Sequence, residues 1–431
     1  MKSPCFVGLD LGTSGCRALA RDEAGKILAR EALPLPTGRR TENGASEQEP
    51  VTWWQAVTGV LKRLVDRLER HRPLALAVAG TSSTLLLADE AGTPLTPALM
   101  YDDRRATEEA ASLAGLAPAE APVHTPTSSL AKLLWLLRHH SFTGKVHALH
   151  QAEWIAGRLC GHFDTGDENN CLKLGYDPVA RRWPEWMEAL DLPADLLPRV
   201  VPPGTVLGVL QPEIATGTGL PPECLVVAGT TDSTAATLAA GLERPGDALT
   251  SLGSTLVTKV LSPRPLFHAD NGVYSHRIFG HWLAGGASNS GGRVLLQFFE
   301  PEELTALSER ITPRRPLCLD YYPLPAPGER FPVNDPGLQP RIHPVPRDRA
   351  RFLQALLEGM ARIEALAYRR LHELGAPRPL RVLTSGGGAG NRAWTEIRER
   401  ILGVPVEAAP RTETAWGAAA IAARGWREGG R

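Results

Sequence analysis

Residues 5–35 read CFVGLDLGTSGCRALARDEAGKILAREALPL, and this stretch is the most informative about the fold. Runs of residues typical of strands lie on either side of the turn Gly12-Thr13-Ser14-Gly15, and another such run follows at residues 26–35. In a dinucleotide-binding domain or a P-loop protein the glycine-rich turn would lead directly into a helix. Here the chain returns as a second strand, which favours a hairpin-type phosphate loop.

The rest of the chain alternates helical and strand patterns. Apolar residues recur near helical spacing in residues 50–71, and a buried-strand run follows at residues 74–80. The pattern predicts a mixed α/β fold. A chain of 431 residues that is 43% hydrophobic has material for two cores. Because proline and glycine accumulate before residue 229, we expect domains at residues 1–225 and 226–431.

Composition argues against several classes of partner. Lys plus Arg equals Asp plus Glu at 47 each, so no overall basic field would attract nucleic acid or an acidic membrane surface. The six cysteines are scattered, without a C-x-x-C pair or a closely spaced histidine, and are expected to be reduced thiols rather than zinc ligands. The apolar run before Asp10 is too short for a signal peptide, and no stretch is apolar enough to span a bilayer. Cytoplasmic residence is the resulting expectation.

Two glycine-bearing turns resemble each other. Residues 249–261, LTSLGSTLVTKVL, share with residues 8–20, GLDLGTSGCRALA, a Leu-Gly-(Thr/Ser)-(Ser/Thr) turn between extended runs. Asp10, Thr13 and Ser14 in the first turn suit phosphates carrying a hydrated Mg²⁺. Ser254 and Thr255 could donate to phosphate oxygens in the second. Taken alone, each turn could equally be a tight hairpin populated by small polar residues.

Two further positions suggest chemistry. Asp232 lies between a strand-like run and a helix start, where it could accept a proton from an alcohol or simply cap the helix. The three glycines at residues 386–388 precede a helix that begins near Asn391, so the backbone could approach a base or ribose, or merely turn. The G-x-x-x-x-G-K-(S/T) and G-x-G-x-x-G motifs are absent. A nucleotide site would therefore rest on distributed loops.

Together these motifs carry a family resemblance. The ordered set GLDLGTSGCRA, SEQEP-x-x-WW, PALMYDDRRA, GTTDS, LTSLGST, YYPLPAPGERFP and SGGGAGN-x-x-W resembles the FGGY carbohydrate kinases over nearly the whole chain. The resemblance implies two ribonuclease H-like domains of the actin and hexokinase type with an interdomain cleft, ATP and Mg²⁺ as cofactors, and a small sugar as substrate. It makes Asp232 the expected catalytic base and Asp10 a catalytic residue that binds Mg²⁺ through water. The other expected site residues are the sugar contacts Ser82 and Ser233, the phosphate-loop residues Thr13, Ser14, Ser254 and Thr255, and the adenosine-binding residues Gly387, Gly388, Asn391 and Trp394.

Within the family, the chain is most similar to the shorter cyanobacterial and plant-type D-ribulokinases, in strings such as GTSSTLLLADEAG and NNCLKLGYDP. Typical xylulokinases carry a Met-His pair where this chain has residues 80–84, GTSST, so D-ribulose is the expected substrate and xylulose the alternative. Asp103 and Arg105 keep a pattern of the wider family, which leaves the sugar open. As residues, they could equally form a surface ion pair of little energetic consequence.

Overall fold

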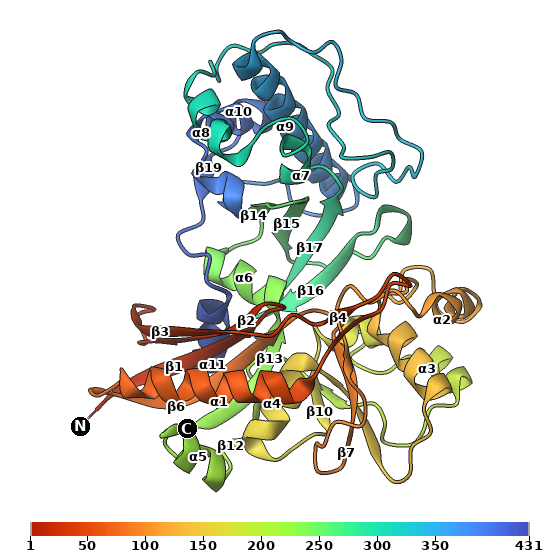
Figure 1. Cartoon of the computed structure of the whole chain (residues 1–431), viewed down its shortest axis with the longest axis vertical. Coiled ribbons are helices and arrows are strands. Elements are labelled where there is room, and N and C mark those ends of the chain that lie inside the picture. The colour runs from red at the N-terminus through yellow and green to blue at the C-terminus, as the bar shows by residue number, and fades with distance from the viewer. Residues whose placement is uncertain (1, 430–431) are drawn as a thin grey trace. The chain divides into compact units, whose positions relative to one another are not determined.

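The computed structural model describes residues 2–429, which form two compact units (Figure 1). The first unit covers residues 2–239 and 413–429, and the second covers Ala240–Thr412. The observed division lies after residue 239 and not at the expected residue 225. Residue 225 is the first residue of β13 (Leu225–Thr231), which pairs with another strand of the first unit. The proline- and glycine-rich segment is therefore a connection inside the first unit, and the C-terminal helix returns to that unit.

The first unit is built on a mixed six-stranded sheet. The glycine turn at residues 12–14 joins two antiparallel strands, which confirms the predicted hairpin. β1, β6 and β13 run parallel, while β2, β3 and β12 are antiparallel to their neighbours. The order is β12-β13-β6-β1-β2-β3, with β1 (Ser3–Leu11), β2 (Gly15–Arg21), β3 (Ile27–Pro34), β6 (His71–Gly80) and β12 (Val206–Val209).

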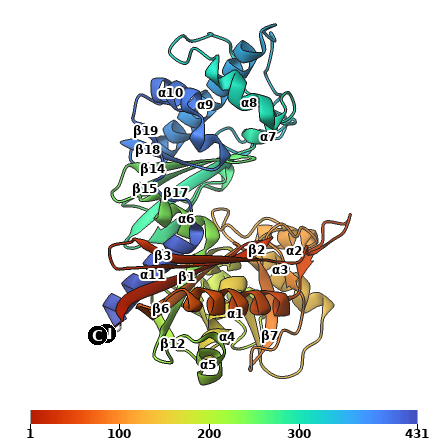
Figure 2. The ribbon, with the colours of Figure 1, turned by 60° about the vertical axis from the view of Figure 1, so that its left-hand side comes forward.

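Helices cover both faces of this sheet (Figures 1 and 2). Alternate residues of a strand point to opposite faces, and Val7 and Leu9 of β1 join the hydrophobic cluster that contains α1 (Pro50–Asp66) and α4 (Gln151–Cys160). Gly8 faces α11 (Thr414–Gly429) instead, where an added Cβ would lie 1.9 Å from the carbonyl oxygen of Ala415. The close approach of α11 to β1 therefore requires glycine at this position.

Smaller elements complete the first unit. A five-stranded sheet has the order β4-β5-β8-β7-β9, and β10 pairs with β11. These strands are β4 (Arg39–Arg40), β5 (Ser46–Gln48), β7 (Leu85–Asp89), β8 (Ala98–Leu99), β9 (Val146–His150), β10 (Thr165–Asp167) and β11 (Arg199–Val201). The remaining helices are α2 (Thr107–Ser112), α3 (Ser129–His139), α5 (Pro212–Thr218) and α6 (Asp232–Ala240), with short 3₁₀ helices η1 (Leu113–Gly115), η2 (Cys171–Leu174) and η3 (Glu185–Leu190).

The second unit repeats the plan of the first. Its sheet has the order β16-β17-β15-β14-β18-β19, with β14 antiparallel to β15 and parallel to β18. The strands are β14 (Asp247–Leu252), β15 (Leu256–Ser262), β16 (Tyr274–Ile278), β17 (His281–Ser288), β18 (Arg381–Ser385) and β19 (Val406–Ala408). The helices are α7 (Gly292–Leu295), α8 (Pro301–Glu309), α9 (Arg349–Glu373) and α10 (Arg392–Leu402), with η4 (Ala269–Asn271) and η5 (Gly387–Gly390).

The two sheets share a five-stranded core. In each, a first strand forms a hairpin with the second, another strand pairs antiparallel with the second, and two further strands lie parallel to the first on its other side. The sixth strand differs, because β12 lies beside β13 in the first sheet and β16 lies beside β17 in the second. The shared core is the arrangement expected of ribonuclease H-like domains, and it places the turns at residues 12–14 and 253–255 at equivalent positions. Among residues 2–429, no helix is both long and apolar enough to cross a membrane.

Candidate active site

Three of the expected site residues lie at one edge of the first sheet. β6 pairs with both β1 and β13 up to its last residue, Gly80, so the carboxyl ends of the three strands are level. Asp10 lies at the end of β1, Ser82 follows β6, and Asp232 follows β13. Neighbouring strands are about 4.8 Å apart, which puts the ends of β1 and β13 roughly 10 Å from each other. Ligands of open α/β sheets bind at this edge.

Asp10 is a buried carboxylate with one cationic neighbour. It is 6% exposed, and its Oδ2 accepts a hydrogen bond of 3.1 Å from Nη1 of Arg17, the residue opposite it in the hairpin. Burial raises the pKa of Asp10, and the Arg17 guanidinium, whose effect is smaller, lowers it. A second cation beside the carboxylate would favour its ionised form.

The first turn is held by the protein through its carbonyl groups. Gln48 Nε2 donates to the Thr13 carbonyl oxygen at 2.8 Å, and the Leu35 N–H donates to that of Ser14 at 2.9 Å. Trp53 Nε1 in turn donates to Gln48 Oε1 at 2.7 Å. Because both carbonyl oxygens point into the protein, their partial negative charges face away from a phosphate bound at the turn. Thr13 is half-buried and Ser14 is exposed.

Asp232 begins α6 and is half-buried. Its Oδ1 accepts a hydrogen bond of 2.6 Å from the N–H of Ser233, which is exposed. The preceding strand end is fixed by a buried bond of 2.9 Å from Asn169 Nδ2 to Thr230 Oγ1. Asp232 is thus the first residue of α6, on the same sheet edge as Asp10.

Buried polar atoms surround the turn that carries Ser82. Gln151 Oε1 accepts bonds of 2.9 Å from both the N–H and the Oγ1 of Thr81. Gln151 Nε2 and Ser83 Oγ are buried and have no hydrogen-bond partner among the described residues. Buried polar atoms without partners usually mark water or ligand positions. Gln151 was not among the site residues expected from the sequence, because no local motif marks its contact with the turn.

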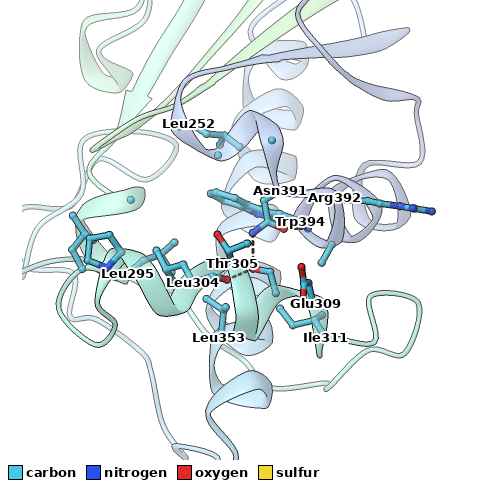
Figure 3. A pocket seen from close by; sticks show the side chains of 18 of the residues that line it. Leu252, Leu295, Leu304, Thr305, Glu309, Ile311, Leu353, Asn391, Arg392 and Trp394 are labelled. Carbon is cyan, nitrogen blue, oxygen red and sulfur yellow. Dashed lines mark hydrogen bonds between the residues drawn. The ribbon is translucent and has the colours of Figure 1, made fainter.

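The second unit contains a pocket of about 1150 Å³. Figure 3 shows Leu252 from the end of β14, Leu304 and Thr305 from α8, and Asn391 and Trp394 from the start of α10 around it. Most of the labelled side chains are apolar, which suits a flat base. Of the residues predicted to bind ATP in this unit, the structure gathers the following around the pocket: Ser254, Gly387, Gly388, Asn391 and Trp394. Thr255 does not line it.

Asn391 ties the pocket wall together. Its Oδ1 accepts a bond of 3.0 Å from the Trp394 N–H and caps α10, while its Nδ2 donates to Ser308 Oγ of α8 at 2.9 Å. A Cβ at Gly388 would lie 2.6 Å from the Trp394 ring and 2.9 Å from Leu252. The glycine therefore lets the loop after β18 close over these two side chains.

The turn at residues 253–255 resembles the first turn in its bonding. The N–H of Gly292 donates to the carbonyl oxygen of Gly253 at 2.8 Å, and that of Arg293 donates to the carbonyl oxygen of Ser254 at 3.3 Å. Here too the carbonyl groups face the protein, which leaves the concave side of the turn suited to an anion.

Comparison with known proteins identifies the family that has these features. Residues 5–239 match the N-terminal domain of the FGGY family of carbohydrate kinases, and residues 248–426 match its C-terminal domain. The chain belongs to the FGGY family of carbohydrate kinases. It is thus an ATP-dependent sugar kinase, as the sequence motifs led us to expect.

Relatives of this FGGY kinase include xylulose kinases. The chain is 28% identical to the xylulose kinase of Klebsiella pneumoniae, over 93% of this chain and 86% of the relative. It is 30% identical to that of Streptomyces coelicolor, over 98% and 88%. The crystal structure of xylulose kinase from Rhodospirillum rubrum is similar with a TM-score of 0.83 and 26% identity, over 99% of this chain and 90% of that one.

The FGGY kinase buries Asp103, which corrects one reading of the sequence. Asp103 is fully buried and accepts bonds from the Arg105 guanidinium, at 2.7 Å for Nη2, and from the N–H of Ser46 at 2.7 Å. Arg105 also pairs with Glu47 at 2.7 Å and stacks over Trp135. The alternative of a surface pair is therefore wrong, because Asp103 is fully buried and the Arg105 side chain is only 12% exposed.

A buried network in the second unit was not anticipated at all. Arg398 binds Glu364 through two bonds of 2.7 Å and donates to Thr384 Oγ1 at 2.7 Å. Thr250 Oγ1 donates to Glu364 at 2.5 Å and accepts from the hydroxyl of Tyr368, whose pKa burial raises. The network joins α9 and α10 to β14 and β18, the strands that lead into the two loops at the pocket.

One metal-like cluster is satisfied by the protein itself. In the described part of the chain, the only group of this kind is His150, Glu153 and Cys171, all buried. Glu153 accepts from His150 Nδ1 at 2.8 Å and from Cys171 Sγ at 3.4 Å, and burial raises the pKa of this thiol. A protonated thiol that donates to a carboxylate is a structural contact rather than a metal ligand.

Proposed function

We propose that this FGGY kinase transfers the γ-phosphate of ATP to a terminal hydroxyl of a ketopentose, with D-ribulose as the acceptor. The observation that carries the proposal is the gathering of Asp10, Ser82 and Asp232 at one sheet edge in a member of a sugar kinase family. D-ribulose is favoured by Ser82 and its neighbours, which replace the Met-His pair typical of xylulokinases. D-xylulose is the second candidate, because the named relatives are xylulose kinases.

Asp232 is the general base of the proposed reaction. Its carboxylate accepts the proton of the attacking O5 hydroxyl as the new O–P bond forms and the bond to ADP breaks. The bond from the Ser233 N–H orients the carboxylate. A positioned base of this kind contributes about 10² to 10⁴ in rate.

Asp10 fits a Mg²⁺ that is held partly through water. The buried carboxylate, whose burial penalises the charge, would gain from a cation, and Mg²⁺ usually binds one or two carboxylates together with phosphate oxygens. When bound, Mg²⁺ neutralises charge on the transferring phosphoryl group. The residue of this chain that would hold it is Asp10, whereas Thr13 and Ser14 are the proposed phosphate-binding residues of the turn.

The pocket of the second unit is the proposed adenosine site. Trp394 and Leu252 offer apolar surface to the base, and Asn391 fixes the start of α10 beside it. The N–H and hydroxyl groups of Ser254 and Thr255 are the proposed phosphate donors in this unit. Water remains the competing acceptor, so we expect a slow ATPase in the absence of sugar.

A panel of ketopentoses tests the proposal. D-ribulose, D-xylulose and their L-isomers are each supplied with Mg²⁺-ATP, and ADP release is followed in a coupled assay. We expect the highest kcat/KM with D-ribulose, and Ser82→Ala should lower it about 10-fold if one oriented hydroxyl is lost. Preference for D-xylulose would overturn the acceptor, and the absence of sugar-dependent ADP release would favour a non-catalytic, nucleotide-binding actin-like module.

A further inference from the structure

α3 carries a lysine that the mechanism does not use. Lys132 is fully buried, and its Nζ donates to the carbonyl oxygen of Ser83 at 2.9 Å and to that of Met100 at 2.6 Å. A buried ammonium is costly unless it is bonded, so its place on the buried, mostly apolar face of α3 requires a reason. The bond to the Ser83 carbonyl oxygen supplies that reason.

The Ser83 carbonyl belongs to the turn that carries Ser82. Ser83 has φ of +65°, a left-handed conformation that is unusual for a residue with a side chain, and it persists only where its surroundings enforce it. Lys132 holds the turn on one side. On the other, Gln151 accepts two bonds from Thr81, and its own N–H donates to the Thr84 carbonyl oxygen at 3.2 Å.

Within this turn only Ser82 is partly accessible. Thr81, Ser83 and Thr84 are 4%, 1% and 0% exposed, whereas Ser82 is half-buried at the sheet edge shared with Asp10. A rotation of the Ser83 peptide would break the Lys132 bond and re-aim the peptide that precedes it. The direction of Ser82 is therefore coupled to the lysine.

We propose that Lys132 is a positioning residue for the acceptor sugar, acting through the Ser83 carbonyl to hold Ser82 toward the substrate. The inference rests on the proposed function, since it takes Ser82 as a sugar contact. Burial lowers the pKa of Lys132 to about 7. Either protonation state keeps at least two N–H donors, enough for both carbonyl groups.

Steady-state kinetics of Lys132→Met tests the role. We expect the KM for the sugar to rise about 10-fold, the loss expected for one oriented hydrogen bond, while kcat and the KM for ATP change less than about twofold. Lys132→Gln, which keeps an N–H donor on a shorter side chain, should show a smaller rise and serves if the Met variant folds poorly. An unchanged sugar KM in both variants would overturn the proposal.

Leu133→Ala is the matched control. Leu133 is the next residue of α3 and is fully buried in the adjoining hydrophobic cluster, but it makes none of the turn's hydrogen bonds. It should lower thermal stability while leaving the sugar KM within about twofold, since the turn keeps its clamp. An equal rise of sugar KM in Leu133→Ala would mean that general loosening of α3 explains the effect, and the proposal would fall.

Amide hydrogen exchange separates the clamp from the proposed function. The N–H groups of Thr84 and Gln151 are bonded within the turn, at 3.3 Å and 3.2 Å, so they should exchange about 10-fold faster in Lys132→Met and at the wild-type rate in Leu133→Ala. Unchanged exchange would overturn the clamp. If exchange is faster in Lys132→Met but the wild type phosphorylates no sugar, then Lys132 does hold the turn, and only its role in sugar binding is overturned.

Discussion

Arg398→Met is expected to destabilise the second unit severely. The side chains of Arg398 and Glu364 are 1% and 0% exposed, and the substitution removes three charge-assisted bonds at once. Among the described residues, Glu364 would then keep only the Thr250 hydroxyl as a donor. A buried carboxylate that has lost its cationic partner destabilises the folded state more than an uncharged group at the same position would. The expected loss of unfolding free energy is therefore about 3–5 kcal/mol.

Urea unfolding, with hydrogen exchange to assign the loss to a unit, measures this effect. Arg392→Met is the matched control, because Arg392 lies on the same helix and pairs with Glu396 at 3.2 Å while being almost wholly exposed. It should leave unfolding nearly unchanged. Adding Glu364→Gln to Arg398→Met should recover part of the loss, since the stranded charge is gone. A loss below about 1 kcal/mol for Arg398→Met would refute the reasoning.

Two further predictions concern the first unit. The unfolding free energy of the wild type, relative to that of Lys132→Met, should rise as pH increases from about 7 to the ordinary lysine pKa of 10.5. The reason is that in this window the unfolded chain binds a proton that the folded chain has released. An unfolding free-energy difference that stays constant across the window would contradict the buried, partly neutral lysine. Gly8→Ala should lower the unfolding free energy by about 3 kcal/mol or more, since its Cβ would lie 1.9 Å from the Ala415 carbonyl oxygen. Gly115→Ala is the control, because a Cβ there meets nothing within 4 Å, and it should change thermal unfolding little. Equal stability of these two variants would contradict the close contact of α11 with β1.

The hairpins and strand ends were predictable because local signals specify them. A glycine turn between two strand-like runs encodes a hairpin, and a residue at or just after the carboxyl end of a buried strand must lie at a sheet edge. Asp10 and Asp232 could therefore be chosen as candidates from the sequence. The order of seven motifs then supplied the family and, with it, the ribonuclease H-like topology that both sheets show.

Long-range packing could not be predicted in the same way. Arg398 and Glu364 are 34 residues apart on two helices, and no local pattern tells that their side chains meet. Lys132 lies in a helix whose pattern shows only which face is buried. The return of α11 to β1 depends on the absence of a side chain at Gly8, which a sequence pattern cannot reveal.

The central claim is that the carboxylate of residue 232 removes the proton from the acceptor alcohol. Asp232→Asn is nearly isosteric and keeps an oxygen for the Ser233 N–H, so α6 should begin as before. The decisive measurement is sugar-dependent ADP release by this variant at saturating ketopentose, alongside its affinity for ATP. The account predicts a fall in kcat of about 10² to 10⁴ with ATP affinity retained, whereas a turnover rate equal to that of the wild type would contradict it.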